Sequence, residues 1–404
     1  MVQSISFIHA ADLHIDSPFK GLTHIPESIF PQVRKSTFQA VDNLVTTAIN
    51  KQVDFVLLVG DLFDHEMQSI QAQVHLKKAF EKLQNHHIQV YLSYGNHDFI
   101  KGNIHPITFP ENVFIFSDEQ VTSFTFEKDN QKIASIYGFS YENRSVITNK
   151  SLEFDVKNES IPFHIAMLHG TVHGNKAHER YAPFRLQDLQ EKHFDYWALG
   201  HIHKREQLSL TPPIIYPGNI QGRHRNETGE KGCYYVELSK NQVVTEFIPL
   251  QSIQFQNITV DVTTCKTVYD MVEKLLQTVG HKDFKSLIHL TLFSQTEQLI
   301  ALDSDGHIEE LLDIVNESLM MQDPWNYIYT YRTQIDDTFK FKHDDFFVGE
   351  IIDSLEEISV KQAVSDLYNH PVGRKFLADI PQKEITKKAK QVLMYELLQI
   401  EEGE

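Results

Sequence analysis

Short apolar runs alternate with longer amphipathic stretches over the first 250 residues of this 404-residue chain. Runs of β-branched and aromatic residues predict buried strands, whereas apolar residues that recur every three or four positions predict helices. This alternation is typical of an α/β domain. Strands are predicted at 4–9, 53–59, 88–94, 113–117, 132–138, 163–168, 195–199, 214–217 and 232–238, and helices at 31–51 and 68–85.

The pattern changes after Pro249. Strands are predicted at 254–262, 285–293 and 325–334, with helices at 266–279 and 306–320, which indicates a small α+β module. An acidic region at 336–345 leads into a stretch with a helical pattern, 346–401. We therefore expect three parts, which are an α/β domain over 1–250, an α+β capping domain over 251–335 and a helical tail over 336–404.

Five predicted strands of the α/β domain are each followed by polar residues with metal-binding side chains. The five segments are Asp12-Leu13-His14, Gly60-Asp61-Leu62-Phe63-Asp64, Gly95-Asn96-His97-Asp98, His169-Gly170 and Gly200-His201-Ile202-His203. Ligands of open α/β sheets bind beyond the carboxyl ends of the strands, so these residues are predicted to meet in one place. One such fragment is common by chance, but five fragments in order, each behind a strand, indicate a shared site.

The residue types at these strand ends favour a metal ion. Asp12 with His14, and His201 with His203, stand two apart on extended chain, so each pair points to one side. Carboxylate, amide and imidazole donors without thiolate suit Mn²⁺, Fe²⁺ or Zn²⁺ and argue against an iron–sulfur cluster. The chain has only two cysteines, which stand far apart and outside any CxxC motif, so a disulfide framework is not expected either.

Composition limits the functional classes. A net charge of −18 is unusual for a protein that handles nucleic acid. The charge is uneven, however, because residues 251–404 contain 27 acidic and 14 basic side chains. Histidine is distributed the other way, since 17 of the 22 histidines precede residue 251. The beginning of the sequence has no basic leader, and no run of 18 apolar residues occurs, so we expect a cytoplasmic protein without a membrane segment.

The ordered motifs DxH, GDxxD, GNHD, HG and GHxH resemble those of the calcineurin-like metallophosphoesterases. Within that superfamily, the segments FIHAADLHIDSPF, LLVGDLFD, SYGNHDF and YPGNIQGRHRNETGEKG are similar to the SbcD-type DNA repair exonucleases, and to their YhaO-like subgroup in particular. The resemblance implies a metallophosphoesterase αββα sandwich, followed by a small α+β capping domain and a helical C-terminal tail.

The resemblance also implies roles for single residues. One divalent ion would be bound by Asp12, His14, Asp61 and His203, and a second by Asp61, Asn96, His169 and His201, with Asp61 as the bridge. Mn²⁺ is the first choice for both ions. His97 would face the leaving group as a proton donor, and Asp98 would orient it by a hydrogen bond.

Other polar residues have weaker support. Arg223 and His224, in the segment that is similar to the exonucleases, are predicted to contact the substrate. Asp16 and Asp64 follow the ligand motifs closely, and they could either hydrogen-bond ligand imidazoles or cap local turns.

Three functions remain open at this point. The first is a two-metal DNA exonuclease or endonuclease that works in DNA repair with an SMC-like ATPase, and the resemblance also implies a homodimer. The second is a phosphatase or phosphodiesterase that acts on nucleotides or proteins, and the third is a non-catalytic scaffold with a structural metal site. The apolar stripes of the tail, such as Val348, Ile351 and Leu355, could dock on the ATPase or pack on the α+β module.

Overall fold

The computed structural model describes residues 4–19, 21–22, 25–64, 68–102, 107–173, 181–280, 283–295, 299, 302–303, 306–335, 385–386 and 389. The chain divides into two compact units. The first comprises Met1–Gln256 and Phe284–Leu287, and the second comprises Asn257–Asp283 and Ile288–Glu404. The predicted helical tail over 336–404 lies outside the described residues, apart from positions 385, 386 and 389.

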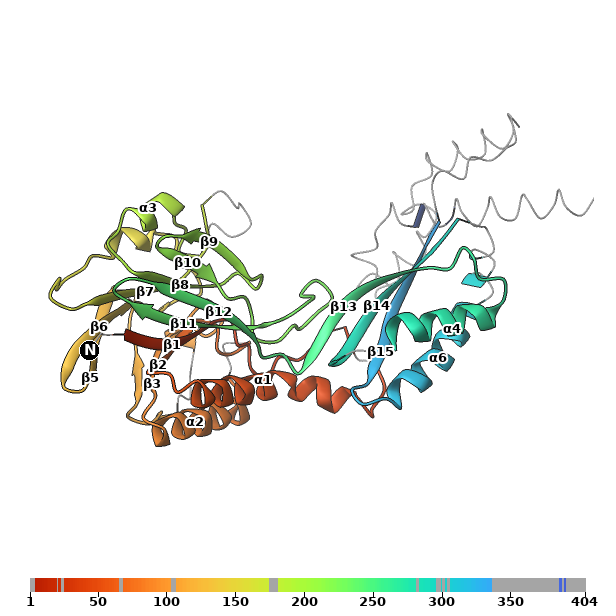
Figure 1. The fold of residues 1–404 in the computed structure, drawn as a ribbon, viewed down its shortest axis with the longest axis horizontal. Coiled ribbons are helices and arrows are strands. Elements are labelled where there is room, and N and C mark those ends of the chain that lie inside the picture. Colours follow the sequence, from red (N-terminus) through yellow and green to blue (C-terminus); the bar gives the residue numbers. More distant parts are fainter. Residues whose placement is uncertain are drawn as a thin grey trace, which may run out of the picture. The chain divides into compact units, whose positions relative to one another are not determined.

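A six-stranded sheet of the first unit has the order β12-β11-β1-β2-β3-β4 (Figure 1). Its strands are β1 (Ser4–Ala10), β2 (Phe55–Val59), β3 (Gln89–Ser93), β4 (Val113–Ile115), β11 (Gly232–Ser239) and β12 (Val243–Pro249). Strands β1 to β4 are parallel, whereas β11 runs antiparallel to β1 and β12 antiparallel to β11. The four parallel strands therefore direct their carboxyl ends to one edge of the sheet.

A second six-stranded sheet has the order β5-β6-β7-β8-β10-β9. Its strands are β5 (Thr122–Lys128), β6 (Gln131–Gly138), β7 (Phe163–His169), β8 (Tyr196–Gly200), β9 (Glu206–Leu210) and β10 (Pro213–Tyr216). The four central strands are parallel, and the two edge strands β5 and β9 are antiparallel to their neighbours.

The two sheets pack face to face through one apolar core. Phe7 and Phe55 of the first sheet belong to the same buried cluster as Ile165 and Tyr196 of the second. Helices α1 (Phe30–Asn50) and α2 (Ile70–Asn85) cover the outer face of the first sheet. The outer face of the second is covered by loops, the short helix α3 (Leu186–Gln190) and the single 3₁₀ turn η2 (Lys150–Glu153), while a further turn, η1, spans Ile100–Gly102.

This arrangement confirms the predicted αββα sandwich. Strands β2 and β7 are buried along their whole length, as expected for parallel strands covered on both faces, and β2 is accordingly a continuous apolar run. Helix α1 begins at Phe30 and has Pro31 in its first turn, where a missing N–H costs nothing.

The second unit contains a three-stranded sheet of order β13-β14-β15 and two helices. Its elements are β13 (Ile253–Asp261), α4 (Val268–Val279), β14 (Lys285–Ser294), α6 (His307–Met320) and β15 (Asn326–Ile335). Thr267 caps α4, because its hydroxyl accepts the Asp270 N–H while the Asp270 carboxylate accepts the Thr267 N–H. Within the described parts of the chain, no helix is long and apolar enough to cross a membrane.

Candidate metal centre

The carboxyl ends of strands from both sheets meet at one edge of the sandwich. The backbone N–H of Asp12, after β1, donates to Gly60 O after β2, at 3.1 Å. The second sheet joins them because His169 Nδ1, at the end of β7, lies 3.0 Å from Val59 O. The His201 N–H, after β8, donates to both carboxylate oxygens of Asp12, at 3.0 and 3.1 Å. The structure thus brings the predicted ligand residues together.

One group of possible ligand atoms comes from Asp12, His14 and His203, whose donor atoms lie within 4.8 Å of one another. The Nε2 atoms of the two histidines are 3.0 Å apart, and His203 Nε2 is 3.8 Å from Asp12 Oδ1. Asp12 and His14 are fully buried, whereas the His203 side chain is partly exposed. This group is therefore accessible from the side of His203.

A second group comes from Asp61, His169 and His201. Asn96 joins it, because its Oδ1 lies 3.1 Å from His169 Nε2 and 3.0 Å from His201 Nδ1. Asp61 Oδ2 lies 3.5 Å from His169 Nε2 and 3.8 Å from His14 Nε2. One oxygen of Asp61 thus faces both groups, which is the position that a bridging ligand requires.

Hydrogen bonding at the far nitrogens shows that these residues fit a cation. Val59 O can only accept, so His169 Nδ1 donates a proton to it, and Nε2, the nitrogen that would bind a metal ion, faces Asp61. Glu227 Oε1 likewise lies 2.7 Å from His203 Nδ1 and can accept a proton from it, and the other ring nitrogen, Nε2, faces His14 Nε2. Ring nitrogens and carboxylate oxygens that converge at such distances repel one another through their lone pairs. Positive charge between them removes this repulsion. Imidazole and carboxylate donors suit divalent manganese, iron or zinc.

The electrostatics of the site favour positive charge. Burial alone would lower the pKa of His169, but the charge and hydrogen bond of Asp61, together with Asp12, raise this pKa to about 9. Burial raises the pKa of Asp12 as well, because its carboxylate is removed from water. Burial would also raise the pKa of Asp61, yet His169 and His14 keep it well below its usual value. The buried carboxylates therefore stabilise a cation among them.

Several of the same residues have a strained backbone. Asp12, His14 and Asp61 have φ values of 52°, 41° and 52°, and His201 has 98°. Residues other than glycine rarely adopt positive φ, and each instance costs on the order of 1–3 kcal/mol. Four such residues in one cluster indicate that the fold maintains an arrangement of side chains required for function.

Two glycines make room for the ligands. A Cβ atom at Gly60, which has a φ of +75°, would collide with the His169 ring. At Gly95 it would collide with the Asp61 carboxylate. Both positions therefore exclude a side chain, and the GD and GN pairs of the sequence follow from close packing around the ligands.

His97 lies beside the first group but is held differently from the sequence-based expectation. Its Nδ1 is 2.9 Å from Asp64 O, and its backbone N–H donates to Asp61 Oδ1. Among the described residues, Asp98 makes no hydrogen bond to the His97 ring, so that part of the prediction is wrong. The buried Asp98 carboxylate instead accepts the N–H groups of Leu62 and Gly95, at 2.6 and 2.7 Å. The reason is that a buried carboxylate takes the nearest backbone donors.

Asp98 and Asp16 stabilise the loops around the centre. Burial, followed by the charge of Asp61, raises the pKa of Asp98 to about 7. Because its carboxylate accepts the N–H groups of Leu62 and Gly95, Asp98 connects the turns after β2 and β3. Asp16 has a φ of 63°, and its backbone N–H donates to Thr37 Oγ1. No hydrogen bond of the Asp16 side chain to a ligand imidazole occurs among the described residues, which favours the turn interpretation.

Sequence reasoning missed Glu227. Its Oε1 lies 2.7 Å from His203 Nδ1, and its side chain is 5% exposed. Burial would raise the pKa of Glu227, but hydrogen bonds with His203 and His224 keep it far below its usual value. No periodic pattern marks this residue. The available signal was its place in the segment 216–232, which is similar to the exonucleases.

The two predicted substrate residues differ in their surroundings. The guanidinium of Arg223 contacts Asp64 and Glu227, and its side chain is 13% exposed. The His224 side chain is 50% exposed. His224 is therefore accessible to a ligand, whereas Arg223 is largely engaged within the protein.

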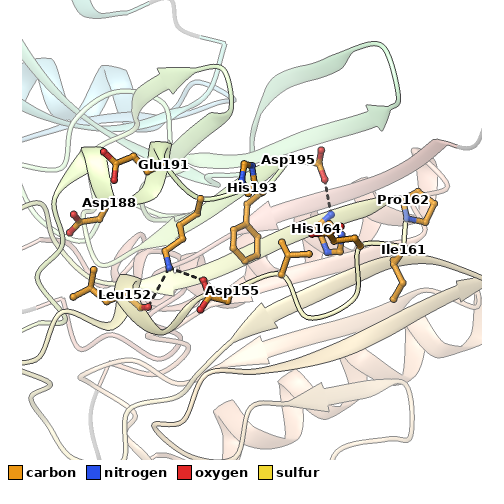
Figure 2. A pocket seen from close by; sticks show the side chains of 13 residues that line it. Leu152, Asp155, Ile161, Pro162, His164, Asp188, Glu191, His193 and Asp195 are labelled. Atoms are coloured by element: carbon orange, nitrogen blue, oxygen red, sulfur yellow. Dashed lines mark hydrogen bonds and ion pairs between the residues drawn. The ribbon is translucent and has the colours of Figure 1, made fainter.

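A separate polar cavity of about 920 Å³ lies at the opposite, amino ends of β7 and β8 (Figure 2). It is lined by apolar residues such as Ile161 and Phe194 and by several carboxylates, including Asp155 and Asp195. It shares no residue with the two groups of ligand atoms at the carboxyl ends.

Comparisons with known proteins agree with this geometry. Residues 5–205 match the calcineurin-like phosphoesterase family. The chain is 36% identical over 406 residues to the uncharacterized metallophosphoesterase YhaO of Bacillus subtilis, an alignment that covers 99% of each chain. It is also 25% identical over 284 residues to the DNA double-strand break repair protein Mre11 of Methanocaldococcus jannaschii, covering 67% of this chain and 72% of that protein.

Proposed function

The chain belongs to the calcineurin-like metallophosphoesterases, and from this premise we propose that it is a two-metal nuclease that hydrolyses phosphodiester bonds of DNA. The family's chemistry is metal-dependent hydrolysis of phosphoesters. The observation that carries the proposal is the pair of ligand groups facing one oxygen of Asp61. A scaffold with one structural ion has no need of a second group that shares a carboxylate with the first.

The proposed ligands are those predicted from the sequence. Asp12, His14, Asp61 and His203 would bind one divalent ion, and Asp61, Asn96, His169 and His201 the other, with Mn²⁺ as the first choice. When bound, two such ions supply positive charge for the phosphate and activate water for attack at phosphorus. The protein residues fix these positions. The chain therefore needs no nucleophile of its own.

His97 is the proposed proton donor for the leaving sugar oxygen. Its Nδ1 is fixed by Asp64 O, so the ring presents Nε2 beside the first ligand group, with the ring centroids of His97 and His14 5.0 Å apart. A histidine is suited to this role because it changes charge near neutral pH. Asp98 acts indirectly in this proposal, by fixing the turn that presents His97 through the N–H groups of Gly95 and Leu62.

DNA is the proposed substrate because the chain resembles a protein that is named for DNA double-strand break repair. The half-exposed His224 is proposed to contact the substrate backbone. The contact between Arg223 and the substrate stays a prediction. The cytoplasm is the proposed compartment.

The test is hydrolysis by the purified full-length protein, stripped of metal and then supplied with Mn²⁺. End-labelled single- and double-stranded DNA are compared with a small chromogenic phosphodiester and a phosphomonoester. We expect Mn²⁺-dependent cleavage of DNA at a higher kcat/KM than that of either small substrate. A preference for the monoester would identify a phosphatase instead, and hydrolysis of no substrate with two bound ions would favour the scaffold.

The proposed partner is an SMC-like ATPase, bound through the tail over 346–401, whose apolar stripes include Ile385, Ala389 and Val392. A chain truncated after Asp337 should remain folded and cleave short oligonucleotides while losing co-purification with that ATPase. Unfolding of the truncated chain would assign the stripes to an internal core. A homodimer is also proposed, and sedimentation of the full chain tests it.

A further inference from the structure

The two imidazoles of the first ligand group each have a carboxylate behind them. His203 Nδ1 lies 2.7 Å from Glu227 Oε1, and His14 Nδ1 lies 3.5 Å from Asp64 Oδ1. The Nε2 atoms of both rings point to one another, 3.0 Å apart. A carboxylate at the far nitrogen fixes the proton there, orients the ring and makes the near nitrogen a better ligand.

Glu227 is itself rigidly placed. Its Oε2 accepts the side-chain N–H of Asn219 and the backbone N–H of Arg223, both at 2.8 Å. Its other oxygen, Oε1, faces His203 Nδ1, with Arg223 Nη2 at 3.4 Å and His224 Nε2 at 3.3 Å. Asn219 is fully buried. The two oxygens therefore have separate tasks, since Oε2 fixes the carboxylate to its own turn and Oε1 faces the imidazole.

Arg223 links the two carboxylates. Its Nη1 contacts Asp64 Oδ1, while its Nη2 lies 3.4 Å from Glu227 Oε1 and 3.2 Å from His203 Nδ1. The guanidinium is planar and always charged, so it sets the spacing of two acceptors and compensates their charge. With 13% of its side chain exposed, Arg223 lies behind the ligands and connects the turn after β2 to the segment before β11.

We propose that Glu227 is a positioning residue that fixes His203 in the Nδ1–H tautomer, and that Arg223 joins it to Asp64 behind His14 in one unit supporting the first metal position. This inference rests on the proposed metal centre. In this inference, Arg223 holds the carboxylates of Asp64 and Glu227 in place. It also assigns a role to the segment 223–227, which lies far from the strand-end motifs in sequence.

The decisive variant is Glu227→Gln, because it preserves the shape of the side chain while the neighbouring N–H donors fix the orientation of the new amide. The site of Oε2 accepts two N–H groups, one of them from the backbone of Arg223, so an oxygen must remain there. The new NH₂ group then faces His203 Nδ1 and donates to it, which forces the proton of His203 onto Nε2. The variant should thus lose the lone pair that would bind the metal.

Mn²⁺ binding to the metal-free full chain, measured by calorimetry, gives the first readout. We expect two ions in the wild type. In Glu227→Gln, one of them should bind about 10–100-fold more weakly and the other with unchanged affinity. The matched control is Glu230→Gln, because Glu230 is half exposed and lies 3.8 Å from Arg205. It should bind both ions as the wild type does.

The second readout needs neither activity nor metal. Nitrogen-15 NMR of the imidazoles at pH 8, with the His203 signals assigned by their loss in His203→Asn, reports which ring nitrogen carries the proton. We expect Nδ1–H in the wild type and Nε2–H in Glu227→Gln. An Nε2–H tautomer in the wild type overturns the inference, and this result stands even if the variant does not fold.

The outcomes separate the inference from the proposed function. If the wild type binds fewer than two Mn²⁺ ions, the proposed metal centre is wrong and the inference fails with it. If the wild type binds two ions and Glu227→Gln binds both as tightly, the metal centre stands and only the positioning role is refuted. Equal weakening of both ions, with a changed circular dichroism spectrum, would assign Glu227 a structural role and also refute the inference.

Discussion

Strands β7 and β8 carry polar side chains at both ends, and the two ends use them in different ways. At the carboxyl ends, ring nitrogens of His169 and His201 face oxygen atoms of Asn96 and, for His169, Asp61. At the amino ends, Asp195 Oδ2 accepts the backbone N–H of His164 at 2.7 Å (Figure 2).

Most of the polar groups discussed at the amino-end cavity form hydrogen bonds within the protein. Lys192 donates to Asp155 at 3.0 Å and to Leu152 O at 3.3 Å. His164 Nδ1 has no partner among the described residues, but no group of three ligand atoms that could hold a metal was found in this cavity within the described part of the chain. Polar residues alone therefore do not make a binding site. Acceptor atoms that converge without donors between them indicate a ligand.

The largest expected effect comes from Asp61→Asn, because the variant loses the charge that faces both ligand groups. Metal analysis should show loss of both ions. Cleavage of DNA should fall by about 10⁴-fold or more, since several kcal/mol of charge stabilisation disappear and each 1.4 kcal/mol is tenfold in rate. The matched change at the other end, Asp195→Asn, should leave metal content and rate unchanged. Two tightly bound ions in Asp61→Asn would contradict the bridge.

His97→Ala should separate chemistry from metal binding. The variant lacks the proposed proton donor but no ligand, so both ions should stay bound while kcat falls by about 10²–10⁴-fold. Metal content and single-turnover cleavage are the measurements. The control is His193→Ala, since His193 is an exposed residue of the amino-end cavity. Wild-type cleavage by His97→Ala would remove this residue from the mechanism.

The convergence of the candidate ligands could be predicted from sequence because the strands that precede them are largely buried. Strand β2, for example, is FVLLV with every residue buried, and the ligand Asp61 stands two residues after it. A continuous apolar run followed by a polar residue marks both the strand and its functional end. Less regular apolar runs followed by polar residues marked β1, β3, β7 and β8. The αββα sandwich followed from the same pattern together with the family resemblance.

The strands that were missed are all at sheet edges. Strands β5, β9 and β12 are each the outermost strand of a sheet. Their burial is partial, so apolar residues are few or alternate with polar ones, as in EQLSL of β9. An edge strand needs only one neighbour and one covered face, and it therefore has a weaker apolar pattern.

The contacts around His97 and His203 could not be predicted because they depend on tertiary packing. Asp98 adjoins His97 in sequence, yet its carboxylate turns to Leu62 and Gly95. Glu227 is 24 residues away from His203, yet it contacts that ring. Neighbours in sequence predict ligands at strand ends, but they do not predict which carboxylate supports which imidazole.

Gly95→Ala should have a smaller effect than loss of His97. The new Cβ would collide with the Asp61 carboxylate, which must then move from its place between the two groups. A displacement of about 1 Å in a catalytic group costs on the order of 10²-fold in rate, so we expect that loss together with weaker Mn²⁺ binding. Gly229→Ala is the control for backbone strain without a collision, because its φ of +79° disfavours alanine while its Cβ would meet open space away from the ligands. Equal rates for the two variants would refute close packing at Asp61.

The smallest expected effect concerns Asp195→Asn, measured as thermal stability against pH. Burial raises the pKa of Asp195, so the folded protein retains this proton to a higher pH than the unfolded chain does. The wild type therefore loses stability as pH rises from the ordinary value, about 3.9, through the raised folded value. The amide cannot ionise, and its oxygen can still accept the His164 N–H. At pH 7 the free energy of unfolding of the variant should equal that of the wild type or exceed it by up to about 0.5 kcal/mol. A clear loss of stability would show that the Asp195 charge is required.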